Sequence, residues 1–193
     1  MAERAVEIDL ETVRLSKIDV AKSQLCEAIM LFFEQRDPVS VHTLSWAALE
    51  IIHEHLDVSG GQVDSCSCVL HYNNVHIKNE YKKFWAKGVR RYRNYFKHAN
   101  FDKDNKIDFN PKTNEIVILE SIMCLNDVCG VDDLPEVLMF VAWASRFTDF
   151  FTGEFKLSAL GYPDVNLYDF SSIIDEIKHM KLPIQLEKNE CNG

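Results

Sequence analysis

Residues 17 to 35 read KIDVAKSQLCEAIMLFFEQ, and this stretch decides the fold class. Its apolar residues recur at the three- and four-residue steps of an amphipathic helix, and Asp37-Pro38 ends the pattern. A helix with one apolar side is stable only when that side is buried against other elements. The stretch therefore predicts a helix packed in a core through Ile18, Ala21, Leu25, Ala28, Ile29, Phe32 and Phe33.

The rest of the chain continues the helical pattern. A second apolar stripe runs from Leu44 to Leu56, with Ser40 or Thr43 as its N-cap and Ser59-Gly60-Gly61 as its end. Residues 57–74 and 100–114 are rich in turn-forming residues and predict loops. We further expect helices over 75–99, over 116–129 with Gly130 as the stop, from Asp132 or Asp133 to Gly153, and over about 167–180.

These segments predict an all-α fold, a single-domain helical bundle of about six helices. We expect the domain to span residues 1–183 and the tail 184–193 to be disordered. The chain has 193 residues, of which 47% are hydrophobic, and this is enough for one well-packed core. No apolar run reaches the ~20 residues of a membrane span, and the N-terminus lacks a secretory signal. A cytoplasmic protein without a membrane partner is the expectation.

The six cysteines are Cys26, Cys66, Cys68, Cys124, Cys129 and Cys191. Most lie in apolar helical patterns, which favours reduced thiols over a disulfide framework. Cys66 and Cys68, with His71 and His76 close behind, are the candidate metal ligands. Their C-x-C spacing departs from the C-x2-4-C spacing of zinc sites, so we interpret them as part of a polar loop and expect no metal. The absence of Walker, G-x-S-x-G and G-x-G-x-x-G stretches argues against P-loop, serine-hydrolase and Rossmann chemistry.

The strongest functional signal is the charge of residues 78–98, which read KNEYKKFWAKGVRRYRNYFKH. This segment carries about +7, whereas the whole chain carries −9, so the remainder carries about −16. Such asymmetry points to an anionic ligand that binds locally. The segment ends in Arg93, Asn94 and His98, which are residue types that can hold a phosphate and transfer a proton near neutral pH.

Helical geometry does not place Arg93, Asn94 and His98 on one side of the expected helix 75–99. We expect its core side to carry Tyr81, Trp85, Gly88, Tyr92 and Tyr95. Asn94 and His98 are then neighbours on the far side, and Arg93 lies on the flank, about 140° from His98. On one regular helix the side chains of Arg93 and His98 therefore point in different directions and do not reach the same phosphate. Two copies of the helix about a two-fold axis would bring both residue types into one cleft, so we expect a homodimer.

Arg93-Asn94-x3-His98 resembles the R-x(4-6)-H motif of the HEPN superfamily of helical-bundle proteins, whose members include metal-independent ribonucleases of toxin and antiphage systems. As a helical architecture the resemblance covers residues 17–150. Two features depart from the family pattern. Compact HEPN toxins often carry a Tyr two places after the His, whereas this chain has Ala99-Asn100, and here the motif ends a long helix.

The resemblance implies an endoribonuclease in which a ribose 2′-hydroxyl attacks the adjacent phosphodiester without a metal or other cofactor. His98 would be the general base or acid, Arg93 would neutralise the charge on the phosphate oxygens, and Asn94 would orient the phosphate or His98. Lys87, Arg90, Arg91 and Lys97 would hold the RNA backbone.

The alternative is a non-catalytic helical module that binds a nucleotide, RNA or a protein partner, or a structural subunit. A partner protein that neutralises a nuclease of this kind is a further candidate among its binding partners. Lysines and arginines on an outward helix face are usually solvated, and a His near a helix C-terminus interacts favourably with the helix dipole. Arg93 and His98 in a shared, partly exposed cleft favour the nuclease. Arg93 and His98 scattered or held in salt bridges favour the binding module.

Overall fold

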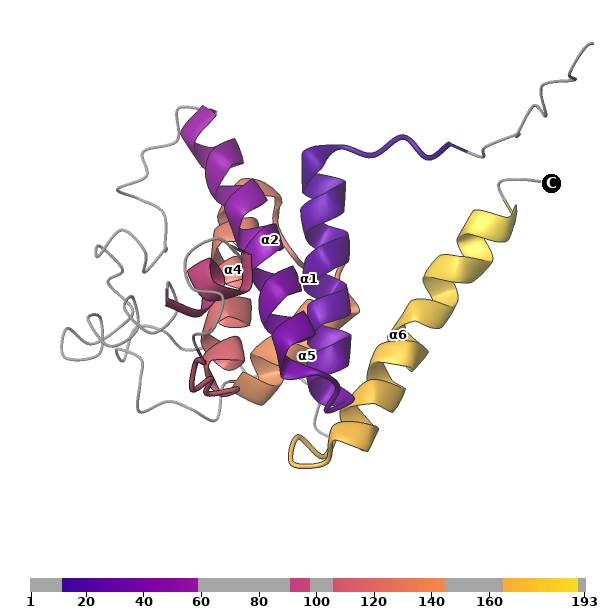
Figure 1. Cartoon of the computed structure of the whole chain (residues 1–193). Helices are drawn as coiled ribbons and strands as arrows, with labels where there is room; N and C mark the ends of the chain where they lie inside the picture. Colours follow the sequence, from indigo (N-terminus) through magenta and orange to yellow (C-terminus); the bar gives the residue numbers. More distant parts are fainter. Residues whose placement is uncertain (1–11, 59–90, 98–105, 145–164, 191–193) are drawn as a thin grey trace, which may run out of the picture.

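The structure is a computed structural model that describes residues 12–58, 91–97, 106–144 and 165–190 (Figure 1). These ranges contain helices and connecting segments and no strand, which confirms the predicted all-α bundle of about six helices. The helices are α1 (Lys17–Phe33), α2 (Pro38–Val58), the helical segment 91–97, α4 (Thr113–Cys129), α5 (Pro135–Ala144) and α6 (Phe170–Glu190).

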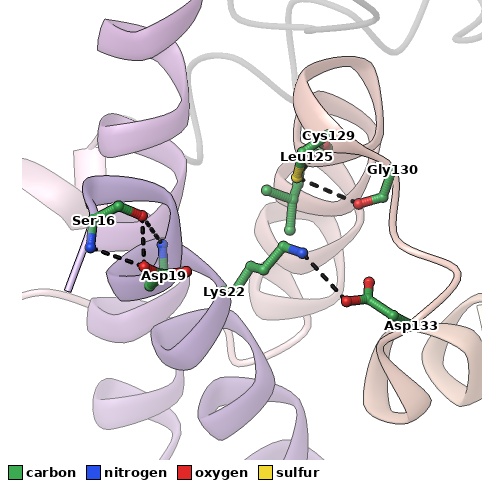
Figure 2. Close-up of polar contacts among 7 residues, drawn as sticks. All are labelled: Ser16, Asp19, Lys22, Leu125, Cys129, Gly130 and Asp133. Carbon is green, nitrogen blue, oxygen red and sulfur yellow. Dashed lines mark hydrogen bonds and ion pairs between the residues drawn. The ribbon is translucent and has the colours of Figure 1, made fainter. Parts of the chain in front are cut away.

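Helix α1 begins where its sequence predicts, because Ser16 and Asp19 form a capping box. The Asp19 amide donates to Ser16 Oγ over 3.1 Å, and the Ser16 amide donates to Asp19 Oδ2 over 2.8 Å (Figure 2). This reciprocal pair satisfies two amides that the first helical turn leaves without partners. The same figure shows Lys22, one turn further on, in an ion pair with Asp133, 3.5 Å away.

The turn between α1 and α2 corrects the predicted start of the second helix. Asp37, and not Ser40 or Thr43, caps α2, since its carboxylate accepts hydrogen bonds from the backbone amides of Val39 and Ser40. Pro38 is the first residue of α2. A proline fits there because the first helical amide has no intrahelical partner and the fixed φ of proline suits a helix. The Asp37-Pro38 pair therefore both ends the first pattern and starts the next helix.

Helix α4 is buried on most sides. Its residues from Thr113 to Leu125 are buried except Glu115 and Ile116, as expected for a helix that is apolar nearly all round. It packs closely on α2, and α2 packs closely on α1. Small polar residues allow this approach, since Ser121 Oγ donates to the Val117 and Ser45 carbonyls. α4 begins three residues before the predicted position and ends at Gly130 as predicted.

The last two helices cover the other side of α1. Helix α5 begins at Pro135, directly after Leu134, so the expectation that Asp132 or Asp133 is its N-cap is wrong; both aspartates lie in the preceding turn. In Figure 1 the C-terminal half of α6 projects away from the other helices. α6 starts at Phe170 and passes through Pro183 to Glu190. The sequence predicted a shorter helix, over about 167–180, and a disordered tail from 184. The structure instead continues the helix through residues 184–190.

One hydrophobic cluster joins α1, α2, α4, α5 and α6. Phe33, Leu49, Leu125, Phe140 and Ile173 are among its fully buried side chains. None of the helices in the described ranges is both long and apolar enough to cross a membrane. Cys26, Cys124 and Cys129, the cysteines within those ranges, form no disulfide bond with one another.

Candidate functional site: the charge cluster on helix 91–97

The helical segment 91–97 lies against the bundle through Tyr92 and Phe96, which are one turn apart. Tyr92 is buried and Phe96 is half-buried. The Tyr92 hydroxyl donates to the Asp108 carbonyl over 3.1 Å and accepts from the Asn110 amide over 3.3 Å. The segment is therefore anchored on residues 106–110, the extended stretch that precedes α4. Tyr95 is 42% exposed, so its expected place on the core side is wrong; the core side runs from Tyr92 to Phe96.

Arg93 and Lys97 form ion pairs with the same carboxylate, that of Glu50 on α2. Arg93 Nη2 contacts Glu50 Oε1, and Lys97 Nζ contacts Glu50 Oε2. The Arg93 guanidinium also lies over the Trp46 ring, with Cζ 5.3 Å from the ring centroid. Trp46 and Glu50 are one turn apart on α2, as Arg93 and Lys97 are on their helix. We call these four residues the Glu50 cluster.

The Glu50 cluster is open to solvent on one side. The side chains of Arg93, Lys97 and Glu50 are 37%, 32% and 27% exposed, whereas Trp46 is buried. The buried Nε of Arg93 and the buried Nε1 of Trp46 have no hydrogen-bond partner among the residues described. Arg93 therefore contacts Glu50 through a single nitrogen, Nη2, and does not form the two parallel hydrogen bonds of a bidentate arginine–carboxylate pair. The cluster carries a net charge of about +1 and has unused hydrogen-bond donors.

The His42 ring contacts the core side of helix 91–97, at Tyr92 and Phe96. His42 is fully buried, and its ring meets those of Trp46, Tyr92, Phe96 and Phe109 edge to face, with centroids 5.4–6.4 Å apart. These five rings form one aromatic layer next to the Glu50 cluster. Trp46 belongs to both groups, since it contacts His42 and Arg93.

Hydrogen bonds assign the His42 tautomer. Asn114 Nδ2 donates to the Pro38 carbonyl, so Asn114 Oδ1 is the atom 2.9 Å from His42 Nδ1, and it accepts a hydrogen bond from the N–H of that nitrogen. Burial lowers the pKa of His42 from 6.5 to about 4, and the Asn114 hydrogen bond opposes this shift only in part. His42 is therefore neutral at pH 7 and serves as a polar link between α2 and α4.

The predicted site residues are brought together only in part. Arg93 and Lys97 meet at Glu50, while Asn94 and Arg91 are exposed on other sides of the helix. The predicted flank position of Arg93 and outward position of Asn94 are confirmed. The remaining predicted site residues lie outside the residues described, and they are His98, Lys87 and Arg90.

Sequence reasoning missed the two residues on α2 that complete the cluster. Glu50 and Trp46 lie on a helix whose apolar stripe was interpreted as core packing alone. Their i,i+4 spacing matches that of Arg93 and Lys97, and this is the signal that the sequence offers. This spacing does not say which two helices face one another, since Glu50 and Arg93 are 43 positions apart in the chain.

A metal centre finds no support in the described part of the chain. No group of three or more His, Cys, Asp or Glu side chains there is arranged to hold a metal ion. Cys124 Sγ lies 3.8 Å from His53 Nε2, but Cys124 is buried and the pair links α2 to α4. Cys66, Cys68, His71 and His76 lie outside the described residues.

Comparison of the chain with protein-family models, with curated proteins and with solved structures finds no match.

Proposed function

We propose that this chain is a helical module that binds RNA or a nucleotide through a phosphate held at Arg93 and Lys97. The observation that carries the proposal is the convergence of these two cations on one carboxylate. Two cations that meet at one anionic group have the spacing that a phosphate oxygen pair requires, and the planar fork of arginine suits phosphate especially well. Trp46 holds the guanidinium in place from behind, so the site is organised before a ligand arrives.

The charge distribution supports a local site for a polyanion. Residues 78–98 carry about +7 in a chain whose formal charge is −9. The acidic remainder repels a nucleic acid from most of the surface, and the basic segment attracts it to one place. Arg91 and Asn94 are exposed on other sides of the same short helix, where a strand of several nucleotides that passes around the helix can contact them.

A metal-independent endoribonuclease of HEPN type is the second candidate. In the sequence His98 is the residue after Lys97, and Arg93 remains about one-third exposed. In that reaction His98 removes the proton of a ribose 2′-hydroxyl, the oxygen attacks the adjacent phosphorus, and the bond to the 5′-oxygen breaks as that oxygen takes a proton from protonated His98. Arg93 neutralises the phosphate oxygens and Asn94 orients the group. A homodimer would supply Arg93 and His98 from opposite chains. The ion pair of Arg93 with Glu50 favours binding over cleavage.

The binding proposal is tested with a fluorescein-labelled single-stranded RNA and the purified full chain, by fluorescence anisotropy at several salt concentrations. We expect Arg93→Gln and Lys97→Gln each to weaken binding about 3- to 10-fold and to reduce the salt slope by about 0.7, the value for one lost contact to single-stranded nucleic acid. Lys178→Gln, which removes an exposed lysine of α6, is the matched control and should change neither quantity. Equal effects of all three variants, or no binding by the wild type, would refute the proposal.

Cleavage is tested separately on a mixed panel of tRNA and single-stranded RNA in EDTA. Products with 2′,3′-cyclic phosphate ends, lost in both His98→Ala and Arg93→Ala while fold and oligomeric state persist, would establish the nuclease. RNA that is bound but left intact under these conditions would leave the binding module as the function.

A further inference from the structure

Glu50 occupies the position that a ligand phosphate would take between Arg93 and Lys97. Its two carboxylate oxygens take one cation each, which is the pattern in which two non-bridging oxygens of a phosphate would be held. The anion in this position therefore comes from the protein itself. A phosphate can reach the same two cations only if the carboxylate moves aside or shares them.

We propose that Glu50 is an internal competitor for the ligand phosphate and sets which anions the site accepts. The inference rests on the proposed function, since it concerns the same two cations. In the free chain the Glu50 carboxylate neutralises Arg93 and Lys97. When a phosphate binds, the carboxylate swings out to solvent and the phosphate takes its place.

Displacement of Glu50 requires only a side-chain movement. The backbone of α2 at this point is fixed by Leu49 and Ile52, which are fully buried. The Glu50 side chain, in contrast, is 27% exposed and has rotatable bonds that lead to solvent. Ion pairs at such partly exposed positions contribute little to stability, so the carboxylate is readily exchanged for another anion.

The cations remain in position after Glu50 leaves. The Trp46 ring holds the Arg93 guanidinium by a cation–π contact that does not involve Glu50. Lys97 is one turn further along the same helix, and that helix is anchored by Tyr92 and Phe96. A phosphate offers more acceptor oxygens than the carboxylate and suits this donor set better.

Competition by Glu50 excludes weakly charged anions. A single monovalent anion gains little by exchanging places with a tethered carboxylate, because the tether keeps the effective concentration of the carboxylate high. A polyanion that is long enough to pass around the helix also reaches Arg91, which is exposed on another side of it, in addition to this exchange. The site should therefore select a nucleic acid chain over small anions.

The experiment compares Glu50→Gln with Glu54→Gln on the full chain, using the same fluorescein-labelled single-stranded RNA. Both variants change the net charge by one unit, and Glu54 lies one turn away on α2, exposed and outside the cluster. We expect Glu50→Gln to bind RNA about 5-fold or more tightly with a salt slope steeper by about 0.7, and Glu54→Gln to bind less than about 2-fold more tightly. In an Arg93→Gln background the gain from Glu50→Gln should be smaller, because only Lys97 is then released.

The outcomes separate the inference from the proposed function. If the wild type binds RNA and Glu50→Gln does no better than Glu54→Gln, the competitor role is refuted while RNA binding stands. If the wild type, Glu50→Gln and Glu54→Gln all fail to bind, both proposals are refuted. Should Glu50→Gln not fold, as judged by circular dichroism, Glu50→Asp provides the test: its shorter side chain cannot reach both cations, and it should also bind more tightly than the wild type.

Discussion

At the scale of single residues, the position of helix 91–97 depends on side chains that carry no charge at neutral pH. Tyr92 was expected to be buried, and it is. Tyr95 was expected on the core side, but its neighbour Phe96 lies there instead, because a helix of 3.6 residues per turn is compatible with either of the two on that side. The aromatic ring of Phe96 meets that of buried His42 at 5.4 Å, and this tertiary contact selects Phe96.

His42 should make the stability of the protein depend on pH. Its pKa is lowered to about 4 in the folded chain, and an unfolded chain has the ordinary value of 6.5. The unfolded state therefore binds the proton more readily, so the contribution of neutral His42 is complete above pH 6.5 and is lost as the pH falls toward 4. Between pH 7.5 and pH 5 we expect a loss of about 2 kcal/mol in the free energy of unfolding.

Urea unfolding of the wild type and His42→Gln at both pH values measures this contribution. The variant should be less stable at pH 7.5, because the aromatic layer loses a ring, and its stability should fall less between the two pH values. A fall of equal size in the two proteins would assign the pH dependence to other groups.

At the scale of secondary-structure elements, helices were well predicted and their ends less well. The apolar periodicities of 17–33 and 116–129 correspond to α1 and α4. The start of α2 was misplaced, because Asp37, Ser40 and Thr43 are all good N-cap residues and the sequence alone does not rank them. Asp37 is selected because Pro38 behind it cannot continue α1 but can begin α2.

Gly130 has a backbone conformation that requires glycine, and the effect of replacing it on stability can be measured. As the C-cap of α4 it has φ of 75° and ψ of 165°, a region that essentially only glycine adopts, and a Cβ at this position would meet no atom within 4 Å. Gly130→Ala should therefore lower the free energy of unfolding by about 1–2 kcal/mol through backbone strain alone. Asn126→Ala, an exposed position in the last turn of α4, is the control and should change stability by less than about 0.5 kcal/mol. Equal stabilities of the two variants would contradict the role of Gly130.

At the scale of the whole molecule, the described side chains of α6 attach it to the bundle through an apolar face and the ion pair of Lys181. Ile173 and Ile177 are fully buried, and Phe170 contacts the rings of Phe33 and Trp143. Beyond this face the ion pair of Lys181 with the buried Glu136 connects α6 to α5. No local pattern predicted this pair, because its two members are far apart in the chain.

Lys181→Ala should loosen α6 by leaving the Glu136 carboxylate buried without its cation. We expect a loss of about 1–3 kcal/mol in the free energy of unfolding, together with faster amide exchange in α6. Lys178→Ala, at an exposed position of the same helix, should have a much smaller effect. Adding Glu136→Gln to Lys181→Ala should restore part of the loss, because it removes the buried charge. A double variant less stable than Lys181→Ala would exclude that explanation.

The sequence by itself determined the fold class, the approximate positions of most helices, and the helix that carries the concentrated positive charge. These properties follow from periodicity, caps and composition, which act over a few residues. The tertiary structure decided which helices face each other, and with them the partners of the site. Glu50 and Trp46 meet Arg93 and Lys97, and His42 lies beneath them, because the buried faces of α2 and α4 fit together in one arrangement. Contacts between distant segments depend on how whole apolar faces pack, and no local pattern contains that information.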